Sequence, residues 1–252
     1  MDKRIKVLGV PVDMVDMKKA VEVVEGFLQT QGLKLVFTPN PEMIIAAQKD
    51  RELMEALNSA DLLVPDGIGL VLMARILGAR VPERVAGYDL VCRLFDLGTR
   101  RGISFYLLGA EPGVAEAARK NLERDYPGIK IGGTHHGYFD EEEGRVIIQE
   151  INRLRPDILL VGLGVPKQEK WLYQNKGILK AKVGIGIGGA LNVIAGRTKR
   201  APKVFIKLGL EWFYRLLKEP RRIKRVIQLL LFVLRVMSVR LMHPGKGGIE
   251  DA

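Results

Sequence analysis

The chain has 252 residues, of which 47% are hydrophobic and 27% are charged, and its formal net charge is +11. This length and apolar content suffice for one well-packed core and exclude a mainly disordered chain. The single cysteine, Cys92, excludes an internal disulfide, so we expect a reducing cytoplasmic setting without a signal peptide and assign Cys92 a packing role.

Short apolar runs with β-branched residues alternate with helical patterns along the first 196 residues. Helices are predicted at 41–58, after the capping candidate Asn40, and at 113–126 and 142–155. The alternation is typical of a Rossmann-like layered α/β domain with a mainly parallel sheet. The predicted strands are residues 34–38, 62–64, 103–108, 130–134, 158–161 and 182–187.

The loops that follow these strands carry the most distinctive residues, and ligands of open parallel sheets bind beyond the carboxyl ends of the strands. Most of the loops contain glycine, which lets backbone N–H groups approach a ligand such as a phosphate. In one loop, Asp66 stands between Pro65 and Gly67. Its carboxylate suits a general base, an acceptor for sugar hydroxyls or a helix cap.

Two common kinds of cofactor chemistry find little support in the sequence. Gly184, Gly186 and Gly189 match the spacing of a dinucleotide fingerprint, but the residues about 20 positions further on are basic, where NAD enzymes have an acid. His135 and His136 lack the i, i+4 spacing of a helical metal site, and the chain has no Asp-x-Asp motif. We therefore predict no cofactor and no metal, with arginines supplying positive charge toward a phosphate.

Positive charge is concentrated near the end of the chain. Residues 197–246 contain 14 Lys/Arg and only two acids, whereas residues 1–196 are close to neutral. We divide the chain into an α/β domain, 1–196, and a basic, amphipathic C-terminal appendage, 197–252, whose charge suits an anionic partner: nucleic acid, phospholipid head groups or a diphosphate. Within it, residues 226–242 are apolar but interrupted by Arg235 and Arg240, which favours a helix lying on a membrane over one crossing it.

Other interpretations of this segment stay open. A core helix or a dimer helix would show the same apolar stripe, and the second of these alternatives predicts a homo-oligomer. A nucleic-acid-binding protein would explain Trp212 and Tyr214 among arginines, but it would not explain the glycine-bearing loops. We therefore predict no nucleic-acid partner.

Several blocks of the sequence resemble the WecG/TagA/CpsF glycosyltransferases. They cover about residues 5–225, in order, and several are too long for coincidence. The blocks are Thr38-x-Asn40-Pro41-Glu42 and the segments 60–69, 83–87, 106–109, 137–139, 156–169, 200–202, 210–216 and 219–222.

The resemblance implies an inverting transfer of N-acetylmannosamine from UDP to undecaprenyl-diphosphate-linked N-acetylglucosamine. The product would carry a β1,4 linkage and belong to wall teichoic acid synthesis. It also implies that residues 1–196 are the catalytic domain, and that the appendage, 197–252, docks peripherally on the inner face of the cell membrane and completes the active site. Related members use other donors such as UDP-N-acetylmannosaminuronic acid, and pocket shape decides between them.

The resemblance also assigns residues. It implies that Asp66 is the base and that Thr38 and Gln168 are catalytic, with Asn40 in the substrate pocket. The phosphate-binding candidates are Arg84, Arg215, Arg222 and Arg225. The uridine contacts, assigned from loop position, are Gly109, Gly137, Gly164, Glu169 and Asn192.

Overall fold

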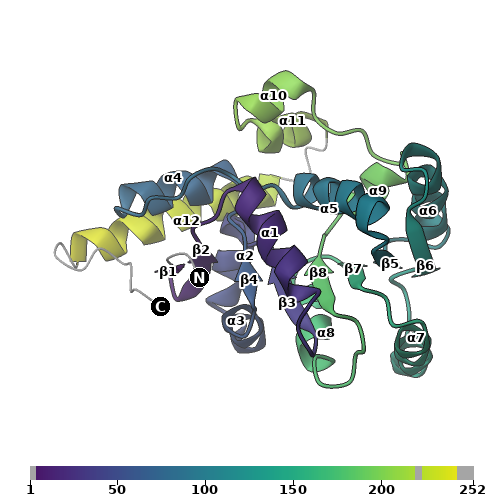
Figure 1. The fold of residues 1–252 in the computed structure, drawn as a ribbon. Helices are drawn as coiled ribbons and strands as arrows, with labels where there is room; N and C mark the ends of the chain where they lie inside the picture. Colours follow the sequence, from purple (N-terminus) through teal and green to yellow (C-terminus); the bar gives the residue numbers. More distant parts are fainter. Residues whose placement is uncertain (1–3, 219–222, 243–252) are drawn as a thin grey trace.

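A six-stranded parallel sheet forms the centre of the molecule. The computed structural model describes residues 4–218 and 223–242. The strand order is β4-β3-β8-β7-β5-β6, and a separate antiparallel hairpin pairs β1 with β2 (Figure 1). The strands are β1 (Arg4–Val7), β2 (Val10–Asp13), β3 (Lys34–Phe37), β4 (Leu62–Leu63), β5 (Ser104–Gly109), β6 (Lys130–His135), β7 (Ile158–Gly162) and β8 (Val183–Gly186).

Twelve described helices surround the sheet and extend beyond its β4 edge. They are α1 (Met17–Phe27), α2 (Pro41–Ala47), α3 (Arg51–Asn58), α4 (Ile68–Ile76), α5 (Gly87–Arg101), α6 (Val114–Asp125), α7 (Glu141–Leu154), α8 (Lys167–Gln174), α9 (Ala190–Ile194), α10 (Lys203–Lys207), α11 (Glu211–Lys218) and α12 (Ile223–Met242).

The structure confirms the α/β class, the parallel sheet and all six predicted strands, with ends that differ by at most one residue. The prediction of a single helix at 41–58 is wrong in one respect, because this segment forms two helices, α2 and α3. Asn40 caps α2 by accepting from the Met43 N–H at 2.9 Å, as predicted, but Asp50 then caps α3 by accepting from the Leu53 N–H at 3.1 Å. An apolar period alone does not reveal this second cap.

Alternating side chains of the sheet enter two separate cores. Leu159 and Val161 of β7 face a core covered by α2, α3, α7 and α8, whereas Ile158 and Leu160 face a core covered by α1, α5, α6 and α9. All four side chains are fully buried. Because both faces of β7 are buried, its sequence is a continuous apolar run and does not alternate between apolar and polar residues.

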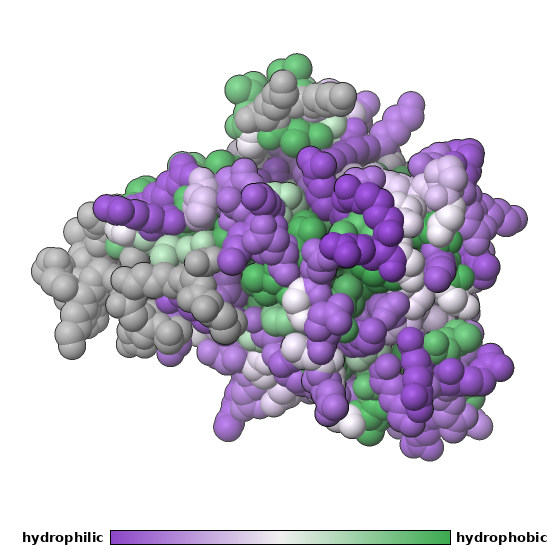
Figure 2. All heavy atoms as spheres, in the orientation of Figure 1, coloured by the Kyte–Doolittle hydropathy of each residue, from purple (hydrophilic) through white to green (hydrophobic). Residues whose placement is uncertain are grey.

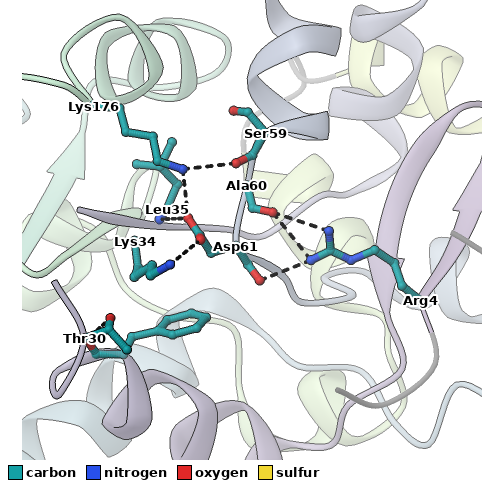
Figure 3. Close-up of polar contacts among 9 residues, drawn as sticks. Arg4, Thr30, Lys34, Leu35, Ser59, Ala60, Asp61 and Lys176 are labelled. Carbon is teal, nitrogen blue, oxygen red and sulfur yellow. Dashed lines mark hydrogen bonds and ion pairs between the residues drawn. The ribbon is translucent and has the colours of Figure 1, made fainter. Parts of the chain in front are cut away.

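Asp61 holds the amino-terminal end of β4 (Figure 3). Its carboxylate accepts from the Leu35 N–H at 2.9 Å and from the ammonium groups of Lys34 at 3.1 Å and Lys176 at 3.0 Å. Burial opposes ionisation, but these donors together hold the pKa of Asp61 below its usual range. Asp61 thus ties two strands to the segment after α8, at the end of the sheet away from the loops that follow the strands.

The long C-terminal helix packs against the first part of the chain. α12 runs along α2 and α4 (Figure 1), and its Phe232 and Val236 are buried in the core that α2 and α4 share. Gly69 of α4 permits this approach, since a Cβ there would lie 2.7 Å from Cδ1 of Leu229. Within residues 4–218 and 223–242, no helix combines the length and apolar character needed to cross a membrane.

Candidate active site

The loops after β3, β4, β7 and β8 converge at one edge of the sheet, as expected for parallel strands. The Asp66 N–H donates to the Pro39 carbonyl at 3.0 Å, which joins the loop after β4 to the loop after β3. The Val85 N–H donates to the Pro65 carbonyl at 2.9 Å and brings the segment before α5 to the same place. Asp66, Thr38 and Arg84 therefore lie around one cavity.

Asp66 is held from two sides. Its Oδ1 accepts from Nε of Arg84 at 3.2 Å, and its Oδ2 accepts a long hydrogen bond from the Gly87 N–H at 3.4 Å. A quarter of the side chain stays accessible. Withdrawal from bulk water raises the pKa of Asp66 above its ordinary value, although the Arg84 charge opposes this rise. A carboxylate with a raised pKa is better matched to accepting a proton near neutral pH.

Arg84 contacts a second acid. Its Nη2 donates to Oε2 of Glu211 at 3.0 Å, and Glu211 begins α11. The guanidinium thus bridges Asp66 and an acid that comes from the C-terminal part of the chain. Sequence reasoning missed Glu211; its only signal was an acid in an otherwise basic segment.

Gln168 is fixed by its neighbours and is almost fully buried. Its Oε1 accepts from the Gly188 N–H at 2.9 Å, and its Nε2 donates to Oε1 of Glu169 at 2.7 Å. A Cβ on Gly186 would come within 2.9 Å of that nitrogen, so glycine is needed there. Burial raises the pKa of Glu169 to about 7. Among the described residues, Oε2 of Glu169 has no hydrogen-bond partner.

Two cavities meet at Asp66. The polar pocket has a volume of about 300 Å³ and is lined by all three predicted catalytic residues. The apolar pocket, of about 560 Å³, lies between α4 and the C-terminal helices α11 and α12. The polar pocket includes Thr38, Asn40, Asp66, Arg84, Gly87, Tyr88, Gly164, Gln168, Gly188 and Arg200. The apolar pocket includes Asn40, Asp66, Arg84, Leu72, Met73, Trp212, Leu216, Leu229 and Val233.

Other predicted residues lie elsewhere. Gly109 and Gly137 line neither cavity. A Cβ on Gly109, at the end of β5, would strike the carbonyl of Gly162 at the end of β7, and a Cβ on Gly137 would lie 2.8 Å from Leu163. Glu169 lies beneath Gln168, and Asn192 lies half-buried in α9. Their assignment as uridine contacts stays a prediction. Arg222 lies outside the described residues, as do the side chains of Arg215 and Arg225.

Arg200 is a further residue whose place in the site the sequence did not reveal. Both of its terminal nitrogens donate to the Asp89 carboxylate, at 2.6 and 2.7 Å, and its guanidinium stacks 4.6 Å from the centre of the Tyr88 ring. This bidentate pair joins the segment after α9 to the first turn of α5. Arg200 and Tyr88 line the polar pocket. Among the described residues there is no cluster of three His, Cys, Asp or Glu side chains suited to a metal.

The sequence is similar to those of a family of known proteins. The sequence model of the Glycosyl transferase WecG/TagA/CpsF family matches residues 5–246. An N-acetylglucosaminyldiphosphoundecaprenol N-acetyl-beta-D-mannosaminyltransferase of Bacillus subtilis (strain 168) is 37% identical over 81% of this chain and 79% of its own. Proteins of the same name from Staphylococcus aureus strains MRSA252 and MW2 are 34% identical over 94% of this chain and 93% of theirs.

The chain has a parallel α/β sheet with a carboxylate and an arginine at its carboxyl edge. Together with these relatives, this arrangement identifies it as a glycosyltransferase. The chain belongs to the WecG/TagA/CpsF family. The family assignment made from the loop motifs is therefore confirmed.

Proposed function

We propose that the chain transfers N-acetylmannosamine from UDP to undecaprenyl-diphosphate-linked N-acetylglucosamine, the acceptor and sugar named in its relatives. The observation that carries the proposal is the position of Asp66, which lies where a polar pocket and an apolar pocket meet. A nucleotide sugar is polar and suits the polar pocket, whereas a lipid-linked sugar also carries a hydrocarbon chain and suits the apolar pocket. The reacting atoms of both would then meet at the Asp66 carboxylate.

In this mechanism Asp66 acts as the base. It takes the proton from the acceptor hydroxyl as that oxygen bonds to the anomeric carbon of the donor. The bond from this carbon to the diphosphate oxygen breaks, and UDP leaves with the electron pair. A single displacement inverts the anomeric centre, which gives a β linkage from an α-linked donor.

The remaining residues would hold the substrates. Thr38, Asn40 and Gln168 offer a hydroxyl and two amides toward sugar or diphosphate, and all three line the polar pocket. Arg84 supplies positive charge beside Asp66. Together with Arg215, Arg222 and Arg225 of the C-terminal segment, it would balance the charge of the diphosphate without a metal ion.

We further propose that residues 197–252 place the enzyme on the inner face of the cell membrane, where UDP-sugars are available. Hydrophobic side chains gather on the projection formed by α10 and α11 (Figure 2), and Val204, Leu208 and Leu217 are among the most exposed apolar residues of the chain. Exposed apolar side chains beside many basic residues are typical of an interfacial segment. Binding to anionic vesicles should therefore keep a salt-resistant component.

The test is UDP release from UDP-N-acetylmannosamine, with a soluble lipid-linked N-acetylglucosamine diphosphate as acceptor and EDTA present. The full chain should show acceptor-dependent release, and the Asp66→Asn variant should not. Since Phe232 and Val236 belong to the core, point substitutions are a cleaner test of the C-terminal segment than its removal. Release only with UDP-N-acetylmannosaminuronic acid would assign a different donor, and loss of release in EDTA would contradict the metal-free mechanism.

A further inference from the structure

The apolar pocket is bounded on one side by α4 and on the other by the C-terminal helices. Leu72 and Met73 come from α4, Trp212 and Leu216 from α11, and Leu229 and Val233 from α12. Leu229 closes directly onto Gly69, so α4 and α12 are in contact along one boundary of the cavity. The pocket is therefore formed by α4 and by helices that lie about 140 to 160 residues further along the chain, and it exists only when α12 is packed on the core.

The pocket changes character along its length. At one end it contains Asn40, Asp66 and Arg84, which also line the polar pocket, and elsewhere hydrocarbon side chains dominate. A ligand matched to it has a polar head at Asp66 and a hydrocarbon tail between α4 and α12. A nucleotide sugar has no such tail. The acceptor in the proposed function has one, joined to its sugar through a diphosphate.

We propose that the apolar pocket binds the first isoprene units of the acceptor's prenyl chain. This inference rests on the proposed function, and it identifies which part of the protein recognises the lipid. The acceptor sugar would lie at Asp66, the diphosphate near Arg84, and the start of the prenyl chain against Leu72, Leu216 and Leu229. The lipid would then be partly drawn out of the bilayer during transfer.

Binding is tested with acceptors that share N-acetylglucosamine diphosphate and differ in their ester: ethyl, geranyl and farnesyl. The chain has two tryptophans, so a Trp171→Phe variant leaves Trp212 as the only reporter. Trp212 is 40% exposed. The geranyl and farnesyl compounds should shift its emission to shorter wavelength and bind at least tenfold more tightly than the ethyl compound. This measurement needs no turnover and no membrane.

A matched pair of substitutions separates the pocket from general membrane contact. Leu72 and Ile76 are both exposed apolar residues of α4, one turn apart, at 47% and 41%, but only Leu72 lines the pocket. Leu72→Gln should reduce the preference for farnesyl over ethyl by about fivefold. Ile76→Gln should keep the preference of the unchanged chain. Thermal unfolding of both variants checks that the fold is retained.

Equal affinity for the ethyl and farnesyl compounds would overturn the inference, and so would an equal loss of preference in Leu72→Gln and Ile76→Gln. Either result would still allow UDP release from UDP-N-acetylmannosamine with the ethyl compound as acceptor, so the proposed function would survive. Failure of the proposed function looks different: no acceptor of any length would be glycosylated, while the binding measurement would still report on the pocket.

Discussion

The guanidinium of Arg84 joins Glu211, a residue 127 positions further along the chain, through a hydrogen bond of 3.0 Å. The same guanidinium uses Nε to contact Asp66, so it cannot offer its full two-nitrogen fork to either acid. Asp66 thereby keeps more of its basicity than it would in a bidentate pair. The C-terminal segment thus contributes directly to the electrostatics of the proposed base.

Asp66→Asn is expected to lower kcat by roughly 100-fold or more, because an amide cannot accept the proton from the acceptor hydroxyl. UDP release measured with saturating donor checks this. The free energy of unfolding should change little or rise, since the partly buried carboxylate is replaced by a neutral group of the same shape. A variant that keeps full activity would show that another group is the base.

Glu211→Gln is expected to lower kcat at neutral pH by about three- to tenfold. Glu211 raises the pKa of Asp66, and its loss leaves Arg84 free to pair fully with that carboxylate. The pKa of Asp66 then falls, so the acidic limb of the pH profile of kcat/KM should move to lower pH. Glu83→Gln is the control, because Glu83 precedes Arg84 but bonds to the Met17 N–H. An unmoved limb would show that Glu211 has only a structural role.

Glu169 predicts a pH dependence of stability. Burial raises its pKa to about 7 in the folded chain, from about 4.5 when exposed. Between these values the folded state holds more protons than the unfolded state, so stability falls as pH rises from about 5 to 7 and then levels. The total loss is on the order of 3 kcal/mol. Urea unfolding from pH 5 to 8 measures it.

In Glu169→Gln the pH dependence of stability that Glu169 causes should disappear, while the amide oxygen of the new side chain can still accept from Gln168. The difference in unfolding free energy, variant minus unchanged chain, should therefore be larger at pH 8 than at pH 5. Parallel curves for the two proteins would mean that Glu169 is ionised throughout this range.

The sequence predicts the strands and their loops well because strands buried on both faces leave continuous apolar runs with glycine at their ends. It also places Thr38, Asp66 and Gln168 at the same edge of the sheet, and the structure brings them to one cavity. Partners far apart in the chain were not predictable in this way. The Arg84–Glu211 and Arg200–Asp89 pairs depend on how α11 and the segment after α9 pack. This packing cannot be predicted from the local sequence pattern.

Gly109 and Gly137 illustrate the opposite difficulty. Glycine at or just after the end of a strand indicates that the backbone approaches another group closely, and sequence alone does not distinguish a ligand from another part of the chain. Here the neighbours are Gly162 and Leu163. The interpretation as ligand contacts therefore needs a direct test, such as uridine binding to a Gly137→Ala variant that is shown to fold.

Asp61→Asn should affect stability and leave catalysis intact, in contrast to Asp66→Asn. The substitution removes the charge that faces Lys34 and Lys176, so we expect a loss of about 1–3 kcal/mol at pH 7. Because these contacts lower the pKa of Asp61, their contribution is present above its unfolded pKa and is lost as the pH falls through the folded value. The difference in unfolding free energy between the variant and the unchanged chain should therefore shrink below about pH 4. Unchanged kcat/KM per folded molecule at 25 °C would show that Asp61 stabilises β4 and has no role in catalysis at the other end of the same strand.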